Sequence, residues 1–177
     1  MFYGVPEVSF TPYMQKSFEQ EMQKNCPSCT VRAVSVGIAT LGTTAPRTIV
    51  TDLQSHPDTN TAALSTGNLA SGLPAALKAA GLPVDTLTFS PQAGQIQDIK
   101  DGRITAGLGF DFPAQAWTAV DAAARLVLGD SPTPTEFAGD VPLQLLGQKD
   151  ITFNPQDGWT GYPDYAERFA KLWHTAP

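Results

Sequence analysis

Hydrophobic and polar residues recur along the chain with two periods, one typical of β-strands and one typical of α-helices. Short runs that are apolar or rich in β-branched residues predict strands. These runs lie at residues 2–5, 30–38, 61–66, 84–89, 104–110 and 143–146. Between them, apolar residues that recur every three or four positions predict helices. The helices are expected at residues 11–25, 44–56, 68–80, 92–100, 114–128 and 162–173.

Several expected helix ends carry residues that suit helix caps. Thr11 precedes Pro12, so Thr11 can cap the first helix while the proline occupies its first turn. Gly81 and Gly129 follow two other helices, and glycine is the preferred residue just past a helix end. These signals support the helix assignments at both ends of the chain.

The regular alternation of strands and helices predicts an α/β fold. Five strand–helix units imply a mostly parallel, doubly wound sheet between two helical layers, which is a three-layer αβα sandwich of the Rossmann-like or flavodoxin-like kind. We expect a single domain over residues 1–177, with a proline-rich link at residues 130–142 before the last strand. Right-handed connections place the carboxyl ends of the strands along one edge, where ligands of such sheets bind.

Composition and charge restrict the classes of molecule that the protein can bind. Hydrophobic residues form 42% of the sequence, a share typical of folded domains, and the net charge is −6. A nucleic-acid backbone repels such a surface, so no nucleic-acid partner is predicted. The first residues, MFYGVPE, have neither the basic nor the apolar region of a signal peptide. We therefore expect a mature fragment, an excised domain or a truncated reading frame.

The motif NCPSCT places two residues between Cys26 and Cys29. The pair follows a predicted helix, where the helix dipole is negative and disfavours a reactive thiolate. A zinc site needs two further ligands, and besides these thiols the sequence offers only His56 and His174 as soft ligands. For the two cysteines, a disulfide is therefore a better interpretation than a redox-active pair or a metal site. Disulfides persist outside the cytoplasm, which favours an extracytoplasmic protein.

Motifs for catalysis or for cofactors are weak. The chain contains no GxSxG sequence, and GLGF and STGN lack both the lysine of a phosphate-binding loop and the full GxGxxG spacing. We predict that the protein is not an enzyme and uses neither a cofactor nor a metal.

Polar and aromatic residues follow the predicted strands at their carboxyl ends. Carboxylates, amides and hydroxyls bind the hydroxyl groups of a sugar, and aromatic rings cover its apolar faces. The alternative is that half of these residues are ordinary turn and cap residues, Asn68 in particular. The candidate ligand-binding residues are Glu7, Phe10, Thr11, Thr66, Asn68, Ser90, Gln92, Phe110 and Asp111.

The stretch FSPQAGQIQDIKDGRITAGLGFDFPAQAWTAVDAAARLVLGDSP resembles the type I periplasmic-binding-protein family, the sugar-binding components of ABC importers. The shared order is a strand, a helix ending in Asp-Gly, a strand of small residues, an alanine-rich helix and a proline-containing link. LQSHPDTNTAALSTGNLASGLPAAL and FTPYMQKSFEQEMQKNCPSCTVRAVSV are similar to the two preceding units of that family, including a CPxC turn.

The resemblance implies the C-terminal lobe of a two-lobed solute-binding protein, without the N-terminal lobe and the export signal. It places the family's polar ligand-binding positions at Thr66, Ser90 and Phe110 or Asp111, and Ser90 replaces a frequent aspartate. The implied partners are a sugar or polyol-like small molecule, the missing lobe and an ABC permease. As an isolated lobe, the chain is expected to form a homodimer. The alternatives are the effector lobe of a sugar-responsive transcription regulator and a stand-alone flavodoxin-like enzyme.

Overall fold

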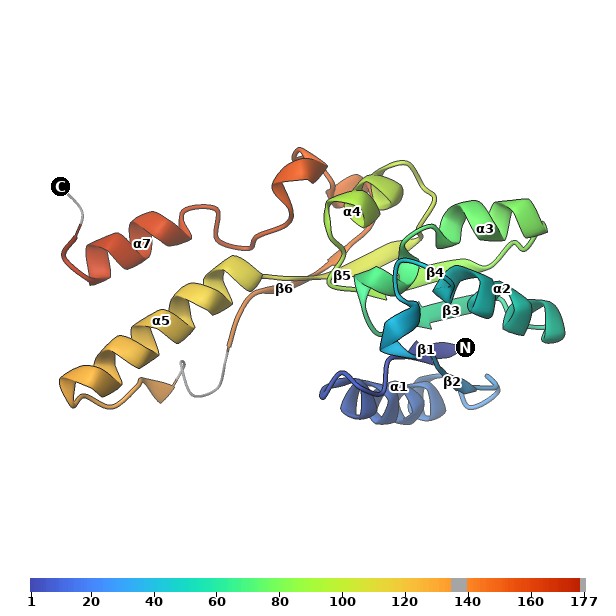
Figure 1. Cartoon of the computed structure of the whole chain (residues 1–177), viewed down its shortest axis with the longest axis horizontal. Helices are drawn as coiled ribbons and strands as arrows, with labels where there is room; N and C mark the ends of the chain where they lie inside the picture. The colour runs from blue at the N-terminus through green and yellow to red at the C-terminus, as the bar shows by residue number, and fades with distance from the viewer. Residues whose placement is uncertain (135–139, 176–177) are drawn as a thin grey trace. The chain divides into compact units, whose positions relative to one another are not determined.

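The structure is a computed structural model, and it describes residues 1–134 and 140–175. The described strands form one six-stranded sheet in the order β2-β1-β3-β4-β5-β6 (Figure 1). The pairs β1–β2, β1–β3, β3–β4 and β4–β5 are parallel, which confirms the mostly parallel α/β fold. The strands are β1 (Phe2–Gly4), β2 (Ala33–Ser35), β3 (Thr61–Leu64), β4 (Asp85–Phe89), β5 (Ala106–Phe110) and β6 (Leu143–Leu146).

The helices follow the predicted order, with differences at their ends. They are α1 (Thr11–Asn25), α2 (Ala45–Ser55), α3 (Leu73–Ala80), α4 (Ala93–Lys100), α5 (Phe112–Leu128) and α7 (Tyr165–Leu172). Helix α3 begins five residues later than expected because the 3-10 turn η2 (Gly67–Ala70) precedes it. Gly81 and Gly129 adopt left-handed conformations past α3 and α5, as predicted. Thr11 is the first helical residue and does not cap α1; Phe10 precedes the helix without a side-chain cap.

The chain divides into two compact units. Unit 1 comprises residues 1–108 and 145–158, and unit 2 comprises residues 109–144 and 159–177. The chain passes between the two units inside the regular elements β5 and β6. The predicted link at residues 130–142 belongs to unit 2, and its residues 135–139 lie outside the described part.

Helices lie on both faces of the unit 1 sheet, as the parallel topology requires. The connection from β1 to β2 runs in one direction along the sheet, and those from β2 to β3, β4 and β5 run in the other. Right-handed connections therefore place α1 on one face and α2, α3 and α4 on the opposite face (Figure 1). This gives the three layers that the sequence pattern predicts.

Tyr3 anchors the centre of unit 1. Its side chain is fully buried on β1, and its hydroxyl donates a hydrogen bond of 2.7 Å to the Asp52 carboxylate on α2. Burial raises the pKa of Tyr3 well above its ordinary value, and the hydrogen bond to Asp52 raises it further. Asp52 also pairs with His56, whose Nδ1 lies 3.2 Å from the carboxylate. The pair joins β1 to the helical layer beside it.

Cys26 and Cys29 form the predicted disulfide directly after α1. The Cys26 amide donates to the carbonyl of Met22, and the Cys29 amide donates to the carbonyl of Cys26. The disulfide therefore closes a tight turn at the carboxyl end of a helix, which agrees with a structural role.

Unit 2 is held together by aromatic side chains between α5 and α7. The rings of Trp117 and Trp173 stack at 5.2 Å, and Phe169 lies 5.6 Å from Trp117. The indole of Trp173 donates to the buried Asp121, whose other oxygen accepts from Arg125 at 2.8 Å. One face of α5 therefore packs against α7 and the residue that ends it. None of the described helices has the length and apolar character needed to cross a membrane.

We predict that Tyr3→Phe lowers the free energy of unfolding by about 1 kcal/mol at neutral pH, because one buried hydrogen bond is lost. Since the folded-state pKa of Tyr3 is raised, its contribution is complete below pH 10 and falls as the pH rises above about 10. The variant should lose stability less steeply in that alkaline range. Urea denaturation at several pH values measures both effects. The control is Tyr13→Phe, at a residue that is 76% exposed. It should change neither the free energy of unfolding nor its dependence on pH.

We predict that the Cys26→Ser/Cys29→Ser double variant unfolds more easily by roughly 2 kcal/mol, because the closed loop is short. Intact mass after alkylation, before and after reduction, reports the bond in protein made in an oxidising compartment. Two thiols that react freely before reduction would contradict the disulfide and the localisation argument drawn from it.

Candidate functional site

The strand order places a topological switch point between β1 and β3, where the chain leaves the sheet in opposite directions. The loops that follow these two strands meet at the carboxyl edge of unit 1. The Val5 amide donates a hydrogen bond of 3.2 Å to the hydroxyl of Ser65, which is fully buried. Ser65 thus ties the two strand ends together and is a structural residue of this edge.

Glu7 and Phe10 lie in the loop after β1, and both are exposed. One carboxylate oxygen of Glu7 accepts a hydrogen bond of 3.2 Å from the Ile38 amide, which fixes Glu7 against the loop after β2. The ring of Phe10 packs edge-on against Phe89 at the end of β4, with 5.6 Å between centroids. Thr11 is only 2% exposed, so burial removes it from the ligand-accessible surface.

The loops after β3 and β4 approach each other at Gly67 and Ser90. A side chain at Gly67 would place its Cβ 2.7 Å from the Ser90 carbonyl oxygen, so the close approach requires glycine. Ser90 itself has a φ of 50°, a left-handed conformation that is uncommon for a residue with a side chain. Such strain persists only where the surrounding structure enforces it, and it concentrates at functional sites.

Gln92 connects Ser90 to the start of α4. The Gln92 side-chain amide donates a hydrogen bond of 3.3 Å to the Ser90 carbonyl oxygen. The Gln92 backbone amide donates a hydrogen bond of 3.0 Å to the side-chain oxygen of Gln95. Gln95 in turn donates to the hydroxyl of Ser71 at 3.1 Å. This network holds the loops after β3 and β4 in one arrangement.

Several polar groups at this edge are available for a ligand. Within residues 1–134 and 140–175, the side chains of Thr66, Asn68 and Ser90 make no hydrogen bond. Thr66 is half-buried, Asn68 is exposed and Ser90 is 7% exposed. Together with Glu7 and Phe10, they offer one carboxylate, one amide and two hydroxyls beside an aromatic ring. Those groups can bind a polyhydroxylated molecule.

Among the described residues, His, Cys, Asp and Glu side chains do not gather in groups of three that could hold an ion.

Phe110 and Asp111 belong to unit 2, unlike the other candidates. Asp111 is fully buried, and one of its oxygens accepts from the Ala114 amide at the start of α5. The other accepts from the Thr160 hydroxyl and from the amides of Gly161 and Tyr162, at 2.8 to 3.1 Å. With four donors on a buried carboxylate, Asp111 organises unit 2 and is not accessible to a ligand. Phe110 is half-buried, with its ring 4.8 Å from Phe112.

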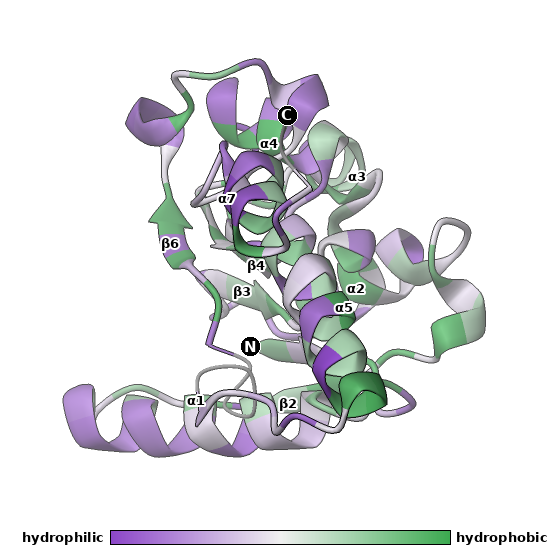
Figure 2. Ribbon diagram, turned by 90° about the vertical axis from the view of Figure 1, so that its left-hand side faces the viewer, coloured by the Kyte–Doolittle hydropathy of each residue, from purple (hydrophilic) through white to green (hydrophobic). Residues whose placement is uncertain are grey.

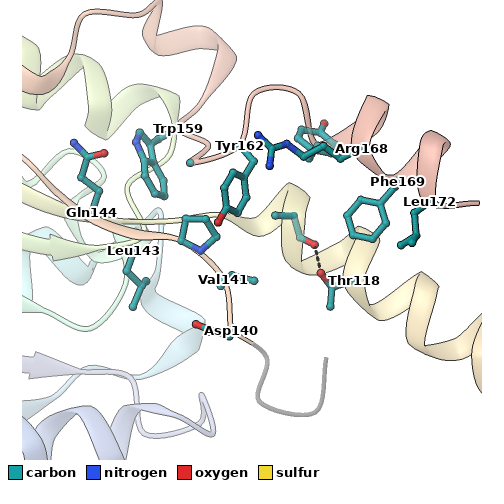
Figure 3. A pocket seen from close by; sticks show the side chains of 14 residues that line it. Thr118, Asp140, Val141, Leu143, Gln144, Trp159, Tyr162, Arg168, Phe169 and Leu172 are labelled. Carbon is teal, nitrogen blue, oxygen red and sulfur yellow. Dashed lines mark hydrogen bonds between the residues drawn. The ribbon is translucent and has the colours of Figure 1, made fainter. Parts of the chain in front are cut away.

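Unit 2 contains a hollow of about 670 Å³ that the sequence patterns did not indicate (Figure 3). Trp159, Tyr162 and Phe169 contribute ring surface to it. The Arg168 guanidinium lies 5.0 Å from the centre of the Tyr162 ring and pairs with Asp164 at 2.8 Å, so its charge is already balanced.

The fold is similar to that of solved sugar-binding proteins of ABC transport systems. A substrate-binding protein of a sugar ABC transport system from Bordetella parapertussis 12822 matches 90% of this chain and 55% of its own, with a TM-score of 0.70 and 20% identity. A myo-inositol-binding protein from Caulobacter, bound to myo-inositol, matches 85% and 52%, with a TM-score of 0.68 and 19% identity.

A third neighbour is a periplasmic solute-binding protein of an ABC transporter from Actinobacillus succinogenes 130z, with bound D-allose. It matches 84% of this chain and 52% of its own, with a TM-score of 0.66 and 15% identity. No protein-family model and no curated protein matches the sequence. The chain has the fold of one lobe of a type I periplasmic binding protein, and it spans about half the length of the solved structures that it matches.

We predict that Gly67→Ala destabilises unit 1 by about 1–3 kcal/mol, because the added methyl group forces the loops after β3 and β4 apart. The matched control is Gly94→Ala. Gly94 lies in α4, where a Cβ meets nothing within 4 Å, and alanine there should raise stability by up to about 1 kcal/mol. Urea denaturation measures both. Equal effects of the two substitutions would contradict the close approach at Ser90.

Proposed function

We propose that the chain is a solute-binding module that captures a sugar or polyol-like molecule. The observation that carries this proposal is the set of available polar groups at the switch-point edge of unit 1, next to the exposed ring of Phe10. Glu7 accepts hydrogen bonds from ligand hydroxyls, Thr66 and Ser90 both donate and accept, and Asn68 does both through its amide. The ring of Phe10 covers an apolar sugar face.

The proposed work is binding and release without chemistry. The neighbours are binding proteins rather than enzymes. In the proposed protein, a second lobe supplies the opposite wall, hinge closure buries the ligand, and the closed form delivers it to an ABC permease. The chain spans about half of each neighbour, which supports a role as one wall of such a site.

The proposed location is extracytoplasmic. The Cys26–Cys29 disulfide supports it, because structural disulfides persist in oxidising compartments. The same bond favours an exported binding protein over the effector lobe of a transcription regulator, whose cytoplasmic thiols would stay reduced. A flavodoxin-like enzyme is less favoured than either, because the neighbours are binding proteins; an absorbance scan for a bound cofactor tests it.

We predict that the 177-residue chain binds sugars weakly, with a dissociation constant of about 1 mM or higher. One wall supplies part of the hydrogen bonds and leaves the ligand in contact with water, which lowers affinity. Ligand-observed NMR against D-allose, myo-inositol, arabinose, glucose and galactose is the measurement. Ser90→Ala and Glu7→Gln should each weaken the signal severalfold.

Asp58→Asn is the matched control for Glu7→Gln. Asp58 is also an exposed carboxylate, but it precedes β3 and therefore lies at the opposite edge of the sheet. Micromolar binding by the chain would show that the site is complete in this half. An absence of binding across the panel, with the fold intact by circular dichroism, would contradict the sugar-binding proposal.

A further inference from the structure

Gln95 is a buried polar residue on a helix whose other buried residues are apolar. Helix α4 carries hydrophilic and hydrophobic residues side by side (Figure 2), and its two isoleucines, Ile96 and Ile99, are fully buried. Gln95 is only 8% exposed. Burial of a side-chain amide costs free energy unless the amide finds hydrogen-bond partners. The partners of Gln95 therefore show what this residue holds in place.

The two ends of the Gln95 amide bind groups from two different loops. Its oxygen accepts a hydrogen bond of 3.0 Å from the backbone amide of Gln92, in the loop after β4. Its nitrogen donates a hydrogen bond of 3.1 Å to the hydroxyl of Ser71, at the end of the loop after β3. The same oxygen lies 3.5 Å from the position that a Cβ would take at Gly67, so it also lies close to the start of that loop. One side chain thus joins the two loops beyond the ends of their strands.

The same two loops carry most of the polar groups that the proposed function assigns to a ligand. Thr66 and Asn68 belong to the loop after β3, and Ser90 follows β4 directly. Gln95 differs from these residues because it is buried and is bonded at both ends of its amide. Its contribution to the site is therefore to hold the groups that meet the ligand, without contact of its own.

The loop after β4 needs such a support because its backbone is strained. Ser90 has a φ of 50°, which a residue with a side chain adopts only where its surroundings enforce it. The Ser90 carbonyl accepts a hydrogen bond from the Gln92 side chain, and the Gln92 backbone is held in turn by Gln95. Relaxation of Ser90 to a negative φ would move its hydroxyl relative to Thr66 and Asn68.

We infer that Gln95 is a positioning residue of the ligand site, which fixes the spacing between the polar groups of the loop after β3 and those of the loop after β4. The inference rests on the proposed function, because it concerns the same site. Side chains that already stand at the spacing of the ligand hydroxyls bind without a cost of ordering. A site that adopts this arrangement only part of the time loses affinity in proportion to that fraction.

Gln95→Met removes the link between the loops. Methionine is an unbranched side chain of similar length, but it neither accepts from the Gln92 amide nor donates to Ser71. We expect the dissociation constants for the sugar panel to rise about tenfold. In two-dimensional NMR spectra recorded without sugar, the amide signals of residues 66–71 and 90–92 should shift.

Gln95→Glu is the conservative variant that should restore binding. Its carboxylate accepts from the Gln92 amide and also from the Ser71 hydroxyl, which can donate as well as accept. Negative charge is favourable in the first turn of a helix, where this residue completes the capping box. The variant should therefore bind each sugar within about threefold of the unaltered chain.

Gln97→Met is the matched control on the same helix. The Gln97 side chain donates a hydrogen bond of 2.9 Å to Asp101, at the carboxyl end of α4 and away from both loops. This substitution removes a glutamine amide of the same kind. It should change neither the dissociation constants nor the amide signals of the two loops.

Two results would overturn the inference. Unchanged affinity in Gln95→Met would show that the site keeps its spacing without this residue. An equal loss of affinity in Gln95→Met and Gln95→Glu would show that the link between the loops is not what the site requires. If the unaltered chain binds no sugar, the proposed function fails, and the amide signals still decide the role of Gln95: signals that do not move in Gln95→Met would show that it does not hold the two loops.

Discussion

The parallel sheet of unit 1 has to be covered on both faces, and most features of the molecule depend on how far that requirement is met. Helices α2, α3 and α4 complete one face, where Ile49, Leu53, Leu73, Ile96 and Ile99 are almost fully buried. Within unit 1, the described part of the other face carries α1, whose apolar residues Met14, Phe18 and Met22 are partly buried. Within unit 1, the fully buried helix residues therefore lie mainly on the side of the sheet that α2, α3 and α4 cover.

The sequence patterns predicted the order of the elements and the strand class because each element carries its own periodicity. Helix α1 has the bounds that its periodicity predicted, and α4 begins one residue from its expected start, where Gln92 and Gln95 form a capping box. The predicted start of α3 was wrong, because the 3-10 turn η2 occupies Gly67–Ala70 before the helix begins. Gly67, the first residue of that turn, lies against the backbone of the distant Ser90, and local propensity does not encode such a contact.

The candidate site shows the same division between local and long-range information. The predicted strand ends bring Glu7, Thr66, Asn68, Ser90 and Gln92 to one edge of unit 1. Asp111 follows β5 in the same way, yet it is buried because Thr160, Gly161 and Tyr162, about fifty residues later in the chain, return to its carboxylate. The hollow beside Tyr162 was not predicted for the same reason, because residues 114–118, 140–144 and 159–172 all contribute to its lining.

The passage of the chain between the units was equally invisible in the sequence. Strand β5 reads as an ordinary internal strand, AGLGF, and α5 as an ordinary amphipathic helix. The structure shows that Trp117 and Asp121, on the other side of α5, are the residues that bind it to α7.

Phe89 links the sheet of unit 1 to the candidate ligand site. It lines a hollow of about 350 Å³ in unit 1, and its ring also packs against Phe10, the aromatic residue of the switch-point edge. The next residue, Ser90, is held in a left-handed conformation by the close approach of Gly67 and the bond from Gln92. Phe10, Phe89 and Ser90 are therefore connected by direct contacts and by the chain itself, so the exposed ring and the left-handed serine of the candidate site share one support.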